Sequence, residues 1–174
     1  MENPKVKIAT SKGDMIVELY EDKVPNTVAN IISLAESGFY KDMAFHRILK
    51  GFMAQGGCPN TKPGEGGMPG TGGPGYTIAE EFHPELKHNE RGILSMAKTA
   101  APNSTGCQFF ILFANAAFLD NGYSVFGKVI EGLEIIDALE EVGHNQDGLP
   151  PKEEIRFSIE VVSKNDHEYT VTKA

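Results

Sequence analysis

Apolar and polar side chains alternate along much of the chain, which predicts short β-strands with one buried face. In the last such segment Phe157, Ile159 and Val161 are separated by single polar residues, the two-residue period of a strand. The predicted strand segments are 5–10, 14–20, 44–55 (a pair of strands), 92–98, 106–113, 124–130 and 155–161. A short turn with Gly13 joins the first two, so we expect a hairpin there.

Two segments instead repeat apolar residues at helical spacing. Pro25 suits the first turn of one helix, and Gly38 suits its end. A second helix is predicted over 133–142, after a single helical turn at 115–119. Residues 56–75 hold nine glycines and four prolines, which predicts a long surface loop.

About eight strands and two separated helices predict a mainly β fold, a closed eight-stranded antiparallel β-barrel capped by two α-helices. The 174 residues are 40% apolar, which is enough for one sizeable core. We therefore expect one domain over residues 1–174, with a core at about 5–163 and a short, peripheral C-terminal tail at 164–174.

Charge and composition argue against several classes of protein. The formal net charge of −8 disfavours nucleic-acid binding, which normally needs a basic surface. The N-terminus shows neither a basic start nor an apolar signal segment, and no stretch approaches the ~18 apolar residues of a membrane span. We expect a monomer in the cytoplasm, without membrane or nucleic-acid partners.

Residues with metal-binding, redox or nucleophilic chemistry lack the usual spacing. Cys58 and Cys107 are 49 positions apart and form no Cys-x-x-Cys pair, so we expect two buried free thiols. The five histidines show no metal-binding spacing. Ser95 and Ser104 lack the Gly-x-Ser-x-Gly turn of hydrolases, and no serine comes with a recognisable base and orienting group. We predict no metal and no cofactor.

One stretch places a cation among bulky apolar side chains. On a strand, Arg47 would share a face with Phe45 and Leu49. Arg47 either lies at a sheet edge and extends to water, or serves as a functional cation on a concave wall. The second interpretation is favoured because Phe52 and Met53 follow, with Gln55 as an amide that both donates and accepts. Such a wall suits an apolar ring joined to an amide, as in a proline within a peptide.

Rotation about a peptide bond meets a barrier of about 18–20 kcal/mol, because the nitrogen shares its lone pair with the carbonyl group. In the twisted transition state the nitrogen becomes pyramidal and can accept a hydrogen bond. A donor aimed at this nitrogen stabilises the transition state more than the substrate. Arg47 is a permanent donor that cannot act as a base, which suits a reaction without proton transfer.

Phe45-His46-Arg47-Ile48 followed by Gly51-Phe52-Met53-Ala54-Gln55-Gly56-Gly57 resembles the signature of the cyclophilins, which are peptidyl-prolyl cis-trans isomerases. Further blocks follow in the family's order at 92–97, 108–111, 118–120 and 125–129. The resemblance covers about residues 5–163. It implies an enzyme without a cofactor that assists protein folding by accelerating rotation about Xaa-Pro bonds in peptides and in unfolded or folded proteins.

The resemblance also implies the site. Arg47 would be the catalytic residue, while an apolar pocket holds the proline ring. The substrate-binding residues would be Phe52, Met53, Gln55, Gly72, Ala97, Lys98, Gln108, Phe110, Phe118, Leu119 and Tyr123. Taken singly, the apolar residues could belong to the core and Gln55 could be a strand amide. Ala97 and Lys98 match positions where main-chain groups bind the residues before proline.

Three residues depart from the family pattern. Lys98 stands in place of an expected asparagine, Phe118 where many members carry tryptophan, and Tyr123 where many carry histidine. The last two replacements are typical of bacterial-type members. Phe118 keeps an aromatic wall but lacks the indole N–H, so we expect weaker binding of cyclosporin with catalysis retained.

A proline-binding module is the alternative from a different functional class, with any turnover incidental. Such a module needs the apolar pocket but does not need Arg47. The presence of Arg47 beside the complete set of pocket residues therefore favours the enzyme.

Overall fold

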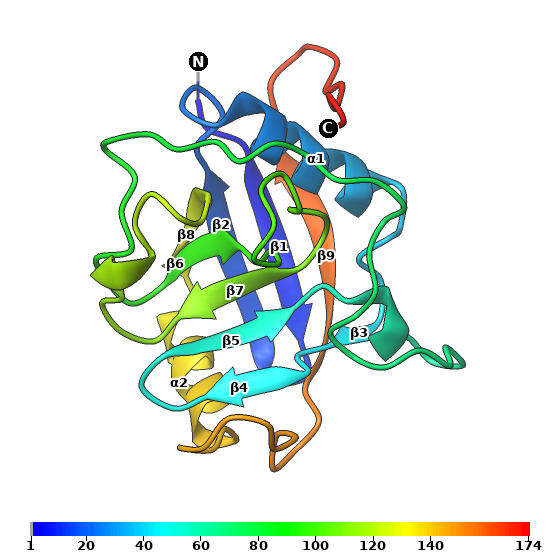
Figure 1. Cartoon of the computed structure of the whole chain (residues 1–174), viewed down its shortest axis with the longest axis vertical. Coiled ribbons are helices and arrows are strands. Elements are labelled where there is room, and N and C mark those ends of the chain that lie inside the picture. Colours follow the sequence, from blue (N-terminus) through cyan, green and yellow to red (C-terminus); the bar gives the residue numbers. More distant parts are fainter. Residues whose placement is uncertain (1) are drawn as a thin grey trace.

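The computed structural model describes residues 2–174, which form one β-sheet, two α-helices and two short 3-10 helices (Figure 1). The strands are β1 (Lys5–Thr10), β2 (Gly13–Leu19), β3 (Met43–Ala44), β4 (Arg47–Leu49), β5 (Met53–Gly56), β6 (Ile93–Met96), β7 (Phe109–Leu112), β8 (Val125–Glu131) and β9 (Arg156–Ser163). The helices are α1 (Pro25–Glu36), α2 (Leu133–Glu141), η1 (Pro59–Thr61) and η2 (Ala117–Leu119). The mainly β fold with two α-helices is therefore as predicted.

The nine strands pair in the order β3-β9-β1-β2-β8-β6-β7-β5-β4, and every pair is antiparallel. This order has two edges, β3 and β4, so the sheet is an open half-barrel of nine strands and the prediction of a closed eight-stranded barrel is wrong. Only Phe45 and His46 separate the two edge strands in the sequence. These two residues connect the edge strands along the chain, but β3 and β4 do not pair through hydrogen bonds.

An aromatic cluster fills the main core. The ring centroid of Phe45 lies 4.4 Å from that of Phe157 and 6.3 Å from that of Phe109, and all three rings are buried. Phe45 precedes β4, and its ring is buried in this core. The prediction that it shares a face with Arg47 is therefore wrong. Alternation begins with β4 itself, where Ile48 is buried in the same core and Arg47 is half-buried.

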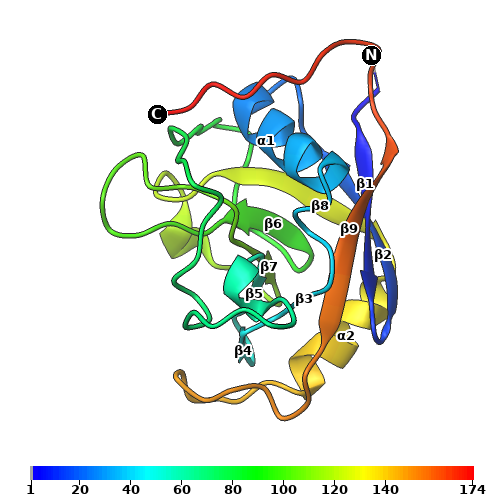
Figure 2. The same cartoon turned by 90° about the vertical axis from the view of Figure 1, so that its right-hand side faces the viewer.

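The two helices lie toward opposite ends of the molecule in both views (Figures 1 and 2). Val28 and Ile32 of α1 and Ile136 and Leu139 of α2 are fully buried and belong to the main core. As predicted, α1 ends before Gly38, whose φ of +81° favours glycine. No helix within residues 2–174 is long and apolar enough to cross a membrane.

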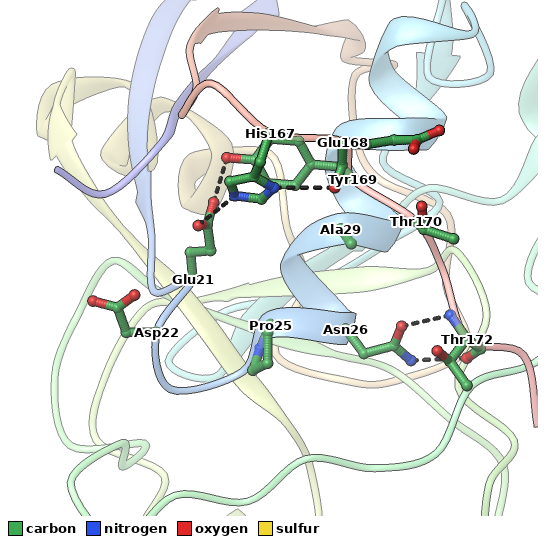
Figure 3. A pocket seen from close by; sticks show the side chains of 10 residues that line it. All are labelled: Glu21, Asp22, Pro25, Asn26, Ala29, His167, Glu168, Tyr169, Thr170 and Thr172. Atoms are coloured by element: carbon green, nitrogen blue, oxygen red, sulfur yellow. Dashed lines mark hydrogen bonds and ion pairs between the residues drawn. The ribbon is translucent and has the colours of Figure 1, made fainter. Parts of the chain in front are cut away.

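The C-terminal tail runs beside the start of α1 (Figure 2). The Asn26 side chain donates to the Thr172 carbonyl at 2.9 Å and accepts from the Thr172 amide at 2.8 Å. A cavity of about 560 Å³ lies between the tail and α1 (Figure 3). The tail is therefore hydrogen-bonded to the first turn of α1.

Glu21 is the centre of the tail contact (Figure 3). Its buried carboxylate accepts hydrogen bonds from Asn165, from His167 at 2.9 Å and from the Tyr169 hydroxyl. Burial alone would raise the pKa of Glu21, but the hydrogen bonds from Tyr169, His167 and Asn165 together lower it. Hydrogen bonds to the Glu168 carbonyl and to Glu21 raise the pKa of His167.

Replacing His167 by glutamine is expected to lower stability only within a window of pH. The raised pKa of His167 means that its charge stabilises the fold below its ordinary pKa of 6.5, and that this contribution is lost as pH rises through the folded value. The lowered pKa of Glu21 stabilises the fold above its ordinary value of 4.5 and is lost as pH falls. Melting temperatures of the native chain and H167Q should therefore differ most near about pH 5.5. An equal difference at about pH 8.5 would contradict this assignment.

Candidate functional site

The predicted cation, amide and aromatic ring lie on three neighbouring strands, β4, β5 and β7 (Figure 1). Arg47 of β4 lies opposite Gln55 of β5, and Gln55 lies opposite Phe110 of β7. Residues directly opposite each other in antiparallel strands present their side chains on the same face. The register of the sheet therefore places Phe110 next to residues that are distant from it in the sequence.

The predicted site residues surround two adjoining cavities. The first, of about 370 Å³, is lined by Arg47, Phe52, Met53, Gln55, Ala97, Lys98, Phe110, Phe118, Leu119 and Tyr123. The second, of about 430 Å³, is lined by Gly72 and Gln108, among others, and it shares Gln55, Ala97 and Lys98 with the first. The structure thus brings all twelve predicted residues together.

The first cavity has a buried apolar floor and an exposed aromatic rim. Met53, Phe110 and Leu119 are all buried and belong to one apolar cluster. The rings of Phe52 and Phe118 lie 5.7 Å apart, and Phe118 is 77% exposed. A small apolar ring can therefore enter from solvent and contact apolar side chains on its inner side.

Side chains hold the glycine-rich loop against the second cavity. The side-chain nitrogen Nε2 of Gln108 donates to the carbonyls of Gly70 and Gly72, at 3.0 and 2.9 Å. The Cys58 thiol accepts the N–H groups of the same two glycines, each at 3.3 Å. Gln55 in turn donates to the Gln108 side chain at 3.0 Å. This chain of contacts links the loop to the strand opposite Arg47.

Arg47 has a partner that the sequence did not predict. Its Nε donates to Oδ1 of Asp147 at 3.0 Å and its Nη2 to Oδ2 at 2.7 Å, while Nη1 donates to Gln55 Oε1 at 3.1 Å. The hydrogen bond from Arg47 lowers the pKa of Asp147 despite some burial. The only local signal was the Asp147-Gly148 pair, which marks a turn but names no partner.

Ala97 and Lys98, which were predicted to contact the residues before proline, already have partners within the protein. The amide of Ala97 already donates to the Gln108 carbonyl at 2.9 Å, so this N–H is not free for a peptide. The ammonium of Lys98 lies 3.7 Å from the Glu80 carboxylate, and both side chains are largely buried. It also lies 5.4 Å from the centroid of the Tyr123 ring. Lys98 therefore contributes a largely neutralised cation to the wall shared by the two cavities.

A serine with a base and an orienting group does occur, contrary to prediction. Nε2 of His88 lies 2.9 Å from Ser95 Oγ, and its Nδ1 lies 2.8 Å from Asp120 Oδ1, an arrangement similar to a hydrolase triad. Ser95 is fully buried within β6, however, so a substrate cannot reach its oxygen. The His88 ring instead stacks on Phe110, with centroids 6.2 Å apart. These three residues support the floor of the first cavity.

Comparison with known proteins gives one consistent result. Residues 5–161 match the family described as cyclophilin type peptidyl-prolyl cis-trans isomerase/CLD. The peptidyl-prolyl cis-trans isomerase CYP18-1 of Arabidopsis thaliana is 40% identical over 160 residues, covering 92% of this chain and 96% of that protein. The peptidyl-prolyl cis-trans isomerase-like 3 of Dictyostelium discoideum is 42% identical over 156 residues, covering 90% and 94%.

A solved structure is also similar. The cyclophilin type peptidyl-prolyl cis-trans isomerase of Cryptosporidium parvum, crystallised in the presence of the dipeptide Ala-Pro, superposes with a TM-score of 0.82 at 37% identity. The match covers 92% of this chain and 99% of that one. These relatives are eukaryotic, so they do not support the prediction of a bacterial-type member.

Proposed function

The chain belongs to the cyclophilin-type peptidyl-prolyl cis-trans isomerases, and from this premise we propose that Arg47 catalyses rotation about Xaa-Pro bonds held in the first cavity. Like its relatives, the protein is a peptidyl-prolyl cis-trans isomerase. The observation that carries the proposed mechanism is the row Arg47, Gln55 and Phe110 across three strands, because it sets a cationic donor beside an apolar pocket.

The proposed mechanism needs no covalent step and no proton transfer. The proline ring lies on Met53, Phe110 and Leu119, and Gln55 holds the backbone beside the ring. As the bond twists, the proline nitrogen becomes an acceptor, and an N–H of Arg47 donates to it. This hydrogen bond forms fully only in the transition state. It therefore stabilises the transition state more than the bound substrate and lowers the barrier.

Residues before the proline would extend toward the second cavity, past Ala97 and Lys98 to Gly72 and Gln108. Support comes from the wall that the two cavities share. We propose proline-containing peptides and unfolded or folded proteins as substrates. The similar Cryptosporidium parvum protein was crystallised with Ala-Pro, which supports a proline-containing ligand.

We further propose a ligand preference, an oligomeric state and a cellular role for the chain. Phe118 and Tyr123 would give the pocket the ligand preference of bacterial-type members, with cyclosporin bound more weakly because Phe118 has no N–H donor. The chain would act as a single-domain monomer in the cytoplasm and would assist protein folding. Equilibrium sedimentation tests the monomeric state, and a calorimetric titration with cyclosporin tests the weaker binding.

The rate of catalysed exchange is expected to be nearly flat from about pH 6 to 9, since no titrating group takes part. Burial, and then the charge of Arg47, lowers the pKa of His46 to about 4. Burial also lowers the pKa of His88, although Asp120 opposes the shift. His46 beside the site therefore stays neutral across this range. Exchange rates of an Ala-Xaa-Pro-Phe peptide measured by NMR check the profile, and a bell-shaped curve would refute the mechanism.

A further inference from the structure

Asp147 lies in the loop between α2 and β9 and contacts Arg47 through both carboxylate oxygens. A guanidinium group carries five N–H donors. Two of them bind Asp147 and a third binds Gln55, which leaves two donors without a protein partner in residues 2–174. Arg47 lines the first cavity, so its remaining donors are available to a substrate there.

The loop holds Asp147 in a defined position beside the edge strand β4. The His144 amide donates to the Ile48 carbonyl at 3.3 Å, and the Lys50 amide donates to the His144 carbonyl at 2.9 Å. Oδ1 of Asp147 also accepts the N–H of Gly148 at 2.9 Å, in a turn where Gly148 has a φ of +89°. Both the main chain and the carboxylate are therefore fixed before a substrate arrives.

Arginine is otherwise a poor candidate for a preorganised donor. Its long side chain has many rotamers, and that of Arg47 is 38% exposed. Two parallel N–H···O bonds to one carboxylate fix the plane of a guanidinium, which a single bond does not. Donors that are already oriented cost no reorganisation when the transition state forms.

We propose that Asp147 is a positioning residue that holds the guanidinium of Arg47 in its catalytic orientation. This inference rests on the catalytic role proposed above for Arg47. Asp147 acts through Arg47 and does not itself contact the substrate. Its loss therefore slows the twisting step more than it weakens peptide binding.

The test compares D147N with a matched control, E153Q. Asparagine keeps an acceptor for the Gly148 N–H but removes the charge and one of the two bonds to Arg47. Glu153 lies in the same loop, is 53% exposed like Asp147, and forms an ion pair with Lys12 at 2.8 Å. Both variants thus remove one negative charge and one exposed ion pair.

Two readouts separate positioning from a general effect on the loop. We expect the rate at saturating peptide to fall about two- to five-fold in D147N, the upper part of the range for loss of an exposed ion pair, with KM unchanged. The NMR signal of the Arg47 Nε–H should exchange with water faster in D147N than in the native chain, because a bond to a neutral amide oxygen is weaker than one to a carboxylate. E153Q should leave the rate and this signal unchanged.

Other outcomes overturn the proposal in recognisable ways. An unchanged or higher rate in D147N shows that the pair does not orient Arg47 for catalysis. An equal loss in E153Q assigns the effect to loop charge. If R47A also retains the native rate, the catalytic role of Arg47 fails first, which is distinct from a failure of the Asp147 inference.

Discussion

Replacing Arg47 by alanine is expected to slow catalysed cis/trans exchange about 10- to 100-fold, while the peptide still binds. A charge-assisted hydrogen bond contributes roughly 1.5–3 kcal/mol, and about 1.36 kcal/mol corresponds to one decade of rate. The apolar floor that holds the proline ring does not involve Arg47, so the dissociation constant should change little. Exchange of an Ala-Xaa-Pro-Phe peptide by NMR measures the rate, and a titration with the same peptide measures binding.

Arg91 offers a matched control for the loss of charge. Its guanidinium is likewise paired with acidic residues, Asp137 and Glu140, and its side chain is 32% exposed. It does not line either cavity of the site. R91A should therefore keep the native exchange rate. If R47A binds the peptide and exchanges it as fast as the native chain, Arg47 is not a transition-state donor, and a proline-binding role for the groove becomes the better interpretation.

Replacing Phe110 by alanine should be the most destabilising change at the site, lowering the free energy of unfolding by about 3–5 kcal/mol. The ring is 5% exposed, and it packs within the cluster that contains Met53 and Leu119. It also contacts His88 and Tyr123, with centroids 6.2 and 6.0 Å away. The cavity left behind removes the wall against which the proline ring lies, so peptide binding is lost as well. Urea unfolding followed by circular dichroism measures the change.

Phe118 is the control within the same cavity. It is 77% exposed at the rim, so F118A should change the free energy of unfolding by no more than about 0.5 kcal/mol. Binding of the peptide should weaken without being abolished, because the buried floor remains. Equal destabilisation by F110A and F118A would contradict this division between floor and rim.

Local pattern was enough to predict the elements that carry the site. The helix from Pro25 to Glu36 ends before Gly38, as its proline, apolar spacing and glycine predicted. Arg47 and Gln55 lie in two strands joined by a tight turn, so their proximity follows from short-range pairing. Phe110 was placed beside them only through the resemblance to a family, since no local rule pairs β5 with β7.

The errors arose where the position of a residue depends on distant segments. Alternation predicts Phe45 on the face of Arg47, whereas the Phe45 ring packs into the core between the two edge strands. The number of strands predicts a closed barrel, but the short strands β3 and β4 lie at opposite edges and do not pair with each other. Both outcomes depend on how the whole sheet curves.

Side-chain periodicity and turn residues therefore sufficed for the mainly β fold class, the two helices and the proximity of Arg47 and Gln55, because these features act over a few neighbouring positions. The other site residues were predicted only from the resemblance to a family. Only the folded chain revealed three further contacts: Arg47 with Asp147, His88 with Ser95 and Asp120, and the buried Glu21 with the tail. Each joins segments whose separation is set by the packing of the sheet and its loops, and no local pattern of residues encodes such a distance.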